Sequence, residues 1–304
     1  MKTILDLSLP RGIRDIEPDE YELHERIRSA FTEMARIYNF RLMEPGTIET
    51  LSLLRAKSGT AVDDEIYSFK DKGGREIGLR FDLTVGMTRY VVGRRDLKPP
   101  IKLASFGGVW RYDEPQHARY RWFHQWDVEV FGDPTTESDA EVMDLSYNLF
   151  QRLEIGGASL QVGDRRVVGE FIKKTLRIEN PDVASEMMRA LDKVSKKSTQ
   201  ELIMEYEVKG IKREDLEALI ELGKLQGSPD KVLARLEELK LESAKDLALV
   251  RDSLKLRGVR DVEYNLSIVR GLDYYTAVVY EVTDKKRPDL GALCGGGRYD
   301  NLPR

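Results

Sequence analysis

Alternating polar residues in the middle of the chain have the chemistry needed to bind a phosphate and a small polar molecule. Arg111 and Asp113 share one face of a strand expected within residues 101–113. The corresponding face of the next expected strand, over residues 121–131, carries Arg121, Phe123, Gln125, Asp127 and Glu129. An arginine offers a planar fork of donors that matches a phosphate. Solvent-facing antiparallel sheets show the same alternation, so the pattern alone leaves a polar cleft floor and a plain surface open.

Two further clusters have a possible chemical role and an ordinary structural explanation. Asp82 and Thr84 end an expected strand and precede a helix, so they can offer a carboxylate and a hydroxyl to an ammonium group. A helix cap is the commoner explanation of such a pair. Arg270 ends another expected strand and is followed by a tight turn with Tyr274 and Tyr275. Its alternative is a hairpin with packed aromatic rings.

Several common sites are excluded by spacing. We expect a glycine-rich turn at residues 295–297, and it matches neither the P-loop pattern nor the usual dinucleotide fingerprint. Cys294 is the single cysteine, so neither a disulfide framework nor a cysteine cluster for zinc is possible. The three histidines do not have a metal-ligand spacing; they are His24, His117 and His124. We therefore predict that the protein binds no metal or prosthetic group of its own.

The elements that must position these residues can be read from hydrophobic periodicity. Pro18 follows acidic residues and begins a helix that ends before Asn39. Its apolar residues recur at steps of three and four: Leu23, Ile27, Ala30, Phe31, Met34 and Ile37. A short strand over residues 41–44 then stops at Pro45.

The remaining pattern predicts an α+β protein in which helices flank an antiparallel sheet. Residues 114–120 are turn-like and join the two polar strands as a hairpin. Lys, Glu and helical spacing dominate residues 166–255, which predicts a helical insertion domain. Strand signals return at 264–270 and 274–282. We expect a core over residues 1–165, the insertion over 166–255, and a return to the core over 256–304.

Composition limits the class of protein. The 304 residues are 41% hydrophobic and 34% charged, which is typical of a soluble globular protein. The net charge of −4 argues against coating nucleic acid by bulk electrostatics, so any RNA contact needs local basic patches. The N-terminal residues lack a signal-peptide core, and no run approaches the ~18 apolar residues that span a membrane. We therefore expect a cytoplasmic protein.

The order of these segments resembles one enzyme family. Residues 111–125, with Glu129 downstream, resemble motif 2 of class II aminoacyl-tRNA synthetases in its histidine-specific form. Residues 79–84 resemble that family's substrate-ammonium segment. Three other stretches resemble the two histidine-signature motifs and the N-terminal signature; they are 270–275, 295–300 and 10–15. The helix and strand before Pro45 are similar to the dimer-forming motif 1. The resemblance covers nearly the whole chain and is weakest in the insertion.

The resemblance implies a ligase that activates L-histidine with ATP and Mg²⁺ and transfers it to tRNA(His). Arg111 would bind the α-phosphate, and Arg270 would neutralise charge where the histidine carboxylate attacks. The implied ATP contacts are Arg111, Asp113, Arg119 and Phe123. The implied ammonium contacts are Asp82, Thr84 and Gln125. Glu129 and Tyr275 would bind the imidazole, with Tyr274 shaping the pocket.

The resemblance also sets expectations about partners and about an alternative function. It implies a homodimer whose insertion domain contacts the tRNA acceptor arm. The family's motif 3 and anticodon-binding domain are expected beyond Arg304, so the chain is expected to be a fragment or a truncated relative. The alternative is the non-catalytic, synthetase-like regulatory subunit of ATP phosphoribosyltransferase, in histidine biosynthesis. The missing anticodon domain favours that subunit, whereas Arg111, Arg270 and the insertion favour the synthetase.

Overall fold

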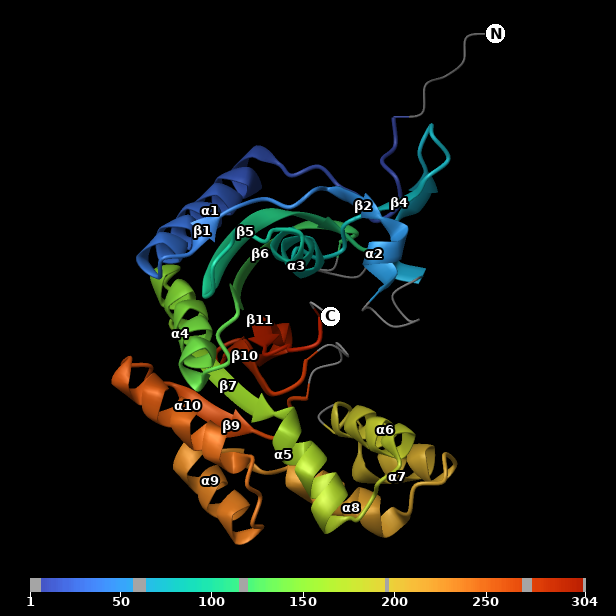
Figure 1. Ribbon diagram of the computed structural model, residues 1–304, viewed down its shortest axis with the longest axis vertical. Coiled ribbons are helices and arrows are strands. Elements are labelled where there is room, and N and C mark those ends of the chain that lie inside the picture. The colour runs from blue at the N-terminus through green and yellow to red at the C-terminus, as the bar shows by residue number, and fades with distance from the viewer. Residues whose placement is uncertain (1–6, 57–63, 115–119, 195–196, 270–274, 303–304) are drawn as a thin grey trace. The chain divides into compact units, whose positions relative to one another are not determined.

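The computed structural model of the chain describes residues 7–56, 64–114, 120–194, 197–269 and 275–302. The chain divides into two compact units between Asp133 and Pro134. We call the part before this boundary unit 1 and the part after it unit 2; their elements are labelled in Figure 1. Within the described residues, no helix is both long enough and apolar enough to cross a membrane.

Within its described residues, unit 1 contains two small sheets and three α-helices. Its strands are β1 (Arg41–Leu42), β2 (Ile48–Thr50), β3 (Ser68–Lys70), β4 (Glu76–Leu79), β5 (Ile101–Trp110) and β6 (Trp122–Phe131). Its helices are α1 (Pro18–Ile37), α2 (Leu51–Arg55) and α3 (Thr84–Val92). The strand orders are β1-β5-β6 and β2-β4-β3. The helix predicted to begin at Pro18 is confirmed, whereas the predicted strand over 41–44 is shorter and ends at Leu42.

The predicted hairpin is confirmed as the antiparallel pair β5–β6. Its register places Ser105 opposite Asp127 and Gly107 opposite Gln125. Helices cover both faces of this pair, with α1 and α3 on opposite sides (Figure 1). Phe31 of α1 packs on the rings of Phe106 and Trp126, so α1 covers the apolar face predicted from period-two spacing. The polar face therefore lies on the side of α3.

Unit 2 contains a five-stranded sheet with the order β11-β10-β7-β9-β8. The strands are β7 (Ala158–Asp164), β8 (Gln226–Gly227), β9 (Val262–Asn265), β10 (Val278–Asp284) and β11 (Ala292–Gly297). The pairs are antiparallel except for β7–β9. In unit 1 the pair β1–β5 is also parallel. The described strands thus form mostly antiparallel sheets with flanking helices, as the sequence predicts.

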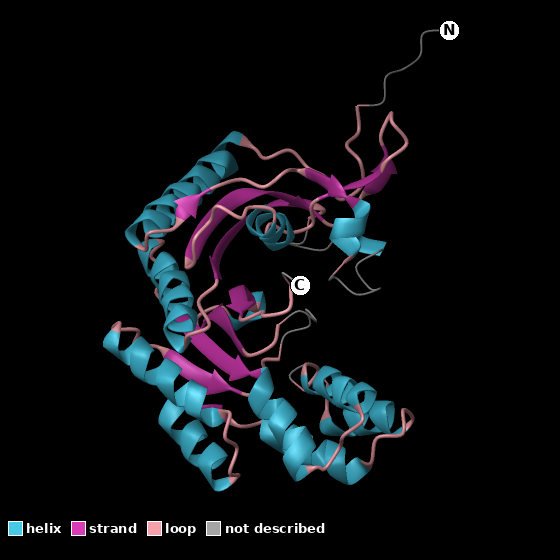
Figure 2. Cartoon of the chain, viewed as in Figure 1, coloured by secondary structure: helices cyan, strands magenta, loops and turns pink. Residues whose placement is uncertain are grey.

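The helices of unit 2 fall into two groups. The unit contains α4 (Thr136–Arg152), α5 (Arg165–Glu170), a π-helix (Phe171–Thr175), α6 (Pro181–Leu191), α7 (Thr199–Glu207), α8 (Arg213–Gly223), α9 (Pro229–Glu238), α10 (Ala244–Leu256) and a short 3-10 helix (Pro288–Leu290). Helices α6–α8 contact one another, whereas α9 packs on β9 and α10 packs on α4 (Figure 2). Helices α6–α9 lie within the predicted insertion and α10 ends one residue beyond it; the limits of 166–255 stay a prediction.

The turn predicted at residues 295–297 is wrong, because these glycines belong to strand β11. They pair with β10, where Gly296 lies opposite Tyr280. A Cβ on Gly296 would lie 2.7 Å from the Tyr280 ring, and one on Gly297 would lie 2.7 Å from Cδ1 of Tyr275. Gly296 and Gly297 therefore allow close packing against tyrosine rings and do not form a chain reversal. The flanking strands are also shifted from the predicted 264–270 and 274–282.

Candidate functional site

A buried arginine holds the segment that carries Asp82 and Thr84. The Arg80 side chain is 3% exposed, and its guanidinium donates to Gly108 O at 2.8 Å and to Pro45 O at 2.6 Å. It also forms an ion pair with Glu44 at 2.8 Å. These bonds fix the residues between β4 and α3 to the hairpin strand β5. The segment is thus positioned by a buried side chain whose donors are satisfied.

Asp82 and Thr84 then point into the start of α3 and onto β6. Asp82 Oδ1 accepts a hydrogen bond from Val85 N at 3.1 Å, so the predicted helix-capping role is part of its function. Thr84 begins α3, and its hydroxyl donates to Glu129 Oε1 at 2.6 Å. Asp82, Thr84 and Glu129 are all buried. The polar face of β6 is therefore not a plain solvent-exposed surface.

Arg111 joins this group from the residue after β5. Its Nε donates to Phe81 O at 3.0 Å, and its Nη2 donates to Gln125 Oε1 at 3.2 Å. Its guanidinium lies 5.2 Å from the centroid of the Phe123 ring. The backbone carbonyl and the amide fix the direction of the guanidinium, and Phe123 offers an aromatic face beside it. This arrangement suits a phosphate bound next to a flat ring.

Gln125 continues the chain of contacts to Asp127. Its Nε2 donates to the two carboxylate oxygens of Asp127 at 3.1 and 3.0 Å. Thr84 Oγ1, which donates to Glu129, also lies 3.5 Å from Asp127 Oδ2. The described contacts thus run from Arg111 through Gln125, Asp127 and Thr84 to Glu129.

Electrostatics in this group disfavour ionised aspartates. Burial raises the pKa of Asp82, and the Val85 N–H and Arg111 oppose that shift only in part. Burial also raises the pKa of Asp127 well above its usual value, and the negative charges of Glu129 and Asp82 raise it further. Gln125 and Arg111 act in the opposite direction. A cation entering here would relieve this repulsion.

The structure brings some of the predicted site residues together in unit 1, whereas others lie in unit 2 or outside the described residues. Arg111, Phe123, Gln125 and Glu129 form the group in unit 1 with Asp82 and Thr84, and the Asp113 carbonyl accepts from Arg121 Nε at 2.9 Å. Tyr275 lies in unit 2, where it is 8% exposed and packs with Ile268, Val279 and Tyr299. Arg119, Arg270 and Tyr274 lie outside the described residues.

The sequence alone assigns no role to two residues of the group. Alternation with Gln125 and Glu129 places Asp127 on the correct strand face and is the signal available for it. Arg80 lies in the segment that resembles the substrate-ammonium segment, but no pattern there indicates burial. Its role depends on acceptors 28 and 35 positions away in the chain, which no local spacing reveals.

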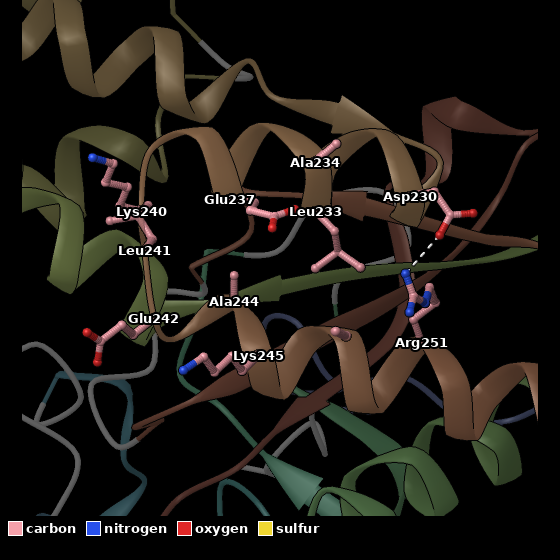
Figure 3. A pocket seen from close by; sticks show the side chains of 11 residues that line it. Asp230, Leu233, Ala234, Glu237, Lys240, Leu241, Glu242, Ala244, Lys245 and Arg251 are labelled. Carbon is pink, nitrogen blue, oxygen red and sulfur yellow. Dashed lines mark hydrogen bonds and ion pairs between the residues drawn. The ribbon is translucent and has the colours of Figure 1, made fainter.

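A pocket elsewhere in unit 2 contains none of these residues. It lies between α9 and α10, with Leu233 and Ala244 inside and the Asp230–Arg251 ion pair, 2.9 Å, at one end (Figure 3). Across the described residues, no group of three or more His, Cys, Asp or Glu side chains is placed to hold a metal ion.

Comparison with protein families matches this chain to the histidyl-tRNA synthetase model over residues 12–304. The chain belongs to the histidyl-tRNA synthetase family. It is 35% identical to histidine--tRNA ligase of Pyrococcus horikoshii over 299 residues, covering 96% of this chain and 68% of that protein. It is 37% identical to the Pyrobaculum arsenaticum ligase, with the same two coverages, over 302 residues.

Solved structures of the histidyl-tRNA synthetase family share its fold. The structure from Nostoc sp. PCC 7120 gives a TM-score of 0.87 at 26% identity and covers 99% of this chain and 70% of that one. A Bacillus halodurans structure, described as an ATP phosphoribosyltransferase regulatory subunit/histidyl-tRNA synthetase, gives 0.83 at 24% identity. It covers 99% of this chain and 78% of that one, and at this identity it supports the fold alone. The α+β, class II synthetase-like fold predicted from the sequence is confirmed.

Proposed function

We propose that this protein activates L-histidine with ATP to form histidyl-adenylate and transfers the histidyl group to tRNA(His). The observation that carries this proposal is the chain of polar contacts from Arg111 through Gln125, Asp127 and Thr84 to Glu129, in which Thr84 donates to Glu129 and lies 3.5 Å from Asp127. It links a predicted phosphate-binding cation to a predicted imidazole-binding carboxylate within one unit. The histidine--tRNA ligases named above support the same reaction, because they share about a third of their residues with this chain.

In the proposed reaction, Arg111 binds the α-phosphate of ATP. Attack by the histidine carboxylate on that phosphorus forms the mixed anhydride, breaks the bond between the α- and β-phosphates and releases pyrophosphate, and it places extra negative charge on the phosphate oxygens. A guanidinium already held by Phe81 O and Gln125 needs little reorganisation to stabilise that charge. Phe123 stacks on adenine, and Asp113 and Arg119 contact the nucleotide. Mg²⁺ enters with ATP as part of the substrate.

Histidine is held at both ends in this scheme. Asp82, Thr84 and Gln125 hold its ammonium group, and Arg270 neutralises charge beside its carboxylate. The Glu129 carboxylate and the Tyr275 phenol bind the imidazole, and Tyr274 shapes the pocket. A site that pairs buried polar groups with a substrate can reject analogues lacking those groups by roughly 10⁴–10⁵-fold. An apolar slot would discriminate far less.

The test is histidine-dependent exchange of pyrophosphate into ATP. We expect exchange by the wild-type chain, and a loss of at least about 100-fold in Arg111→Ala, as for removal of a donor that stabilises developing charge. Arg270→Ala should cause a similar loss. Arg94→Ala is the matched control, because Arg94 forms an exposed ion pair with Asp96. Exchange that is unchanged in Arg111→Ala would contradict the proposed role of this residue.

The same assay separates the proposed enzyme from a regulatory subunit. The second candidate is the one that the sequence resemblance leaves open, the non-catalytic, synthetase-like regulatory subunit of ATP phosphoribosyltransferase. A regulatory subunit would bind histidine without exchanging pyrophosphate. Histidine-dependent exchange would therefore exclude the regulatory function for this chain.

Two partners belong to the proposal. We propose that the insertion at 166–255 contacts the tRNA acceptor arm; deleting residues 170–250 from the enzyme should then abolish charging, and unchanged charging would contradict it.

We also propose a homodimer formed through the motif 1 helix α1. Leu23 and Ile37 of α1 are 57% and 66% exposed, which supports a second surface against this helix. Sedimentation of wild type and Leu23→Glu would test the dimer.

A further inference from the structure

Asp127 lies at the centre of the polar group but has no assigned role in histidine activation. It is half-buried on β6, between Gln125 and Glu129 on the same strand face. Both of its oxygens accept from Gln125 Nε2, at 3.1 and 3.0 Å. Thr84 Oγ1 lies 3.5 Å from Oδ2. Its contacts are therefore with residues predicted to hold the amino acid.

These contacts fix which way the Gln125 amide points. A guanidinium can only donate hydrogen bonds, and an ionised carboxylate can only accept them. Arg111 on one side and Asp127 on the other thus force the amide oxygen toward Arg111 and the amide nitrogen toward Asp127. Without the carboxylate, the amide could turn over and present the opposite polarity to a substrate.

The negative charge of Asp127 does not stabilise the folded protein when the site is empty. Within the described residues of unit 1, this group contains the carboxylates of Asp82, Asp127 and Glu129 and the guanidinium of Arg111. Burial and the two neighbouring carboxylates raise the pKa of Asp127 well above its usual value, so its ionised form destabilises the empty site. Such a charge becomes favourable when a cation binds beside it.

We propose that Asp127 is a positioning residue for the amino acid: it orients the Gln125 amide and adds the negative charge that a substrate ammonium group needs. This role rests on the proposed function, because it assumes that Gln125, Asp82 and Thr84 hold the ammonium of histidine. It extends that function by adding a third carboxylate to the amino-acid site. The ligand class is an amino acid that carries its α-ammonium group.

The test compares Asp127→Asn with wild type in the 304-residue chain. The asparagine oxygen can still accept from Gln125 Nε2, so the substitution mainly removes charge. We expect at least about tenfold weaker binding of L-histidine by titration calorimetry, as for loss of a hydrogen bond to a charged group, and ATP affinity within about twofold of wild type. Imidazolepropionate, which lacks the ammonium, should bind wild type and Asp127→Asn equally.

Thermal unfolding separates this role from a structural one. The midpoint of ligand-free Asp127→Asn should equal or exceed that of wild type. Asp164→Ala is the control, because Asp164 is fully buried, caps α5 by accepting from Arg166 N, and is bound by Arg166 Nη2 at 2.6 Å; removing these acceptors should lower the midpoint. If Asp127→Asn is destabilised like the control, or loses histidine and ATP binding together, the proposal is wrong.

Binding by wild type distinguishes the two levels of inference. Equal histidine affinity in wild type and Asp127→Asn would overturn the role of Asp127 and leave the proposed function intact. No histidine binding by wild type would overturn both. A tenfold loss for histidine that is equally large for imidazolepropionate would also overturn the proposal, because the ammonium would not be the group involved.

Discussion

The buried carboxylate of Asp164 in unit 2 and the half-buried carboxylate of Asp127 in unit 1 have different neighbours. In unit 2, Asp164 accepts from Arg166 N, Nε and Nη2 at 2.8, 3.1 and 2.6 Å, and Arg166 also binds Asp246 at 2.5 Å. In unit 1, Asp127 accepts from a neutral amide and lies near two other carboxylates. Burial raises the pKa of both aspartates, but arginine bonds oppose the shift only at Asp164 in this direct way.

The two carboxylates therefore have different effects on stability. A buried charge that is matched by a partner in the same unit holds elements together, as Asp164 and Arg166 join β7 to α5. A charge beside like charges costs stability and needs another reason to be there. The carboxylates of Asp82, Asp127 and Glu129 in unit 1 therefore fit ligand binding, whereas that of Asp164 in unit 2 fits folding.

The largest expected effect is on the matched network of unit 2. Arg166→Met should leave Asp164 buried without its cation and lower the free energy of unfolding by about 3–5 kcal/mol. Urea unfolding of both proteins measures this change. Arg94→Ala, which breaks an exposed pair, should leave the unfolding curve unchanged. A loss below about 1 kcal/mol in Arg166→Met would remove the contrast between the units.

An intermediate effect is expected at Glu170, at the end of α5. Burial opposes its charge, but bonds from Lys174, Ser243 and Glu242 N outweigh burial and lower its pKa from 4.5 to about 2. Because the folded pKa is lowered, the stabilisation is present above pH 4.5 and is lost as pH falls toward 2. Glu170→Gln should lower the free energy of unfolding at neutral pH by about 1–3 kcal/mol.

The pH series gives the check on Glu170. Wild type and Glu170→Gln should approach each other in urea unfolding as pH falls toward 2, where about half of the folded wild-type molecules have Glu170 protonated. A constant difference between the two proteins across this range would show that lost packing, and not lost charge, causes the effect.

The smallest expected effect has the opposite sign and lies in unit 1. Because the folded pKa of Asp127 is raised, its protonated form stabilises the fold below pH 3.8, and that contribution is lost as pH rises through the raised value. Ligand-free Asp127→Asn should match wild type at low pH and become slightly more stable toward pH 7. Thermal midpoints measured across pH check this trend. A variant that becomes less stable than wild type as pH rises would break the comparison.

Local patterns in the sequence predicted the elements that carry the site. Period-two alternation placed Gln125, Asp127 and Glu129 on one face of a strand, and the structure has them on one face of β6. Proline and acidic residues predicted the start of the helix at Pro18. These features depend on neighbours two to four positions apart, which is the range that sequence periodicity reports.

Other features of the site could not be read from spacing. The glycines at 295–297 suggested a turn, but they lie in a strand, where the Tyr280 ring on the neighbouring strand leaves no room for a side chain at Gly296. The role of Arg80 depends on backbone carbonyls of Pro45 and Gly108, which approach it only in the folded chain. A glycine-rich segment is compatible with a turn and with a closely packed strand, and only long-range packing distinguishes the two.

The sequence by itself determined the family, the hairpin and the identity of the polar side chains that face one way. The tertiary structure decided which of those side chains share hydrogen bonds, and that Asp127 belongs with Thr84 and Gln125. It also decided which buried carboxylates have a cation beside them, as at Asp164. Charge balance depends on distances between residues far apart in the chain, and those distances exist only after folding.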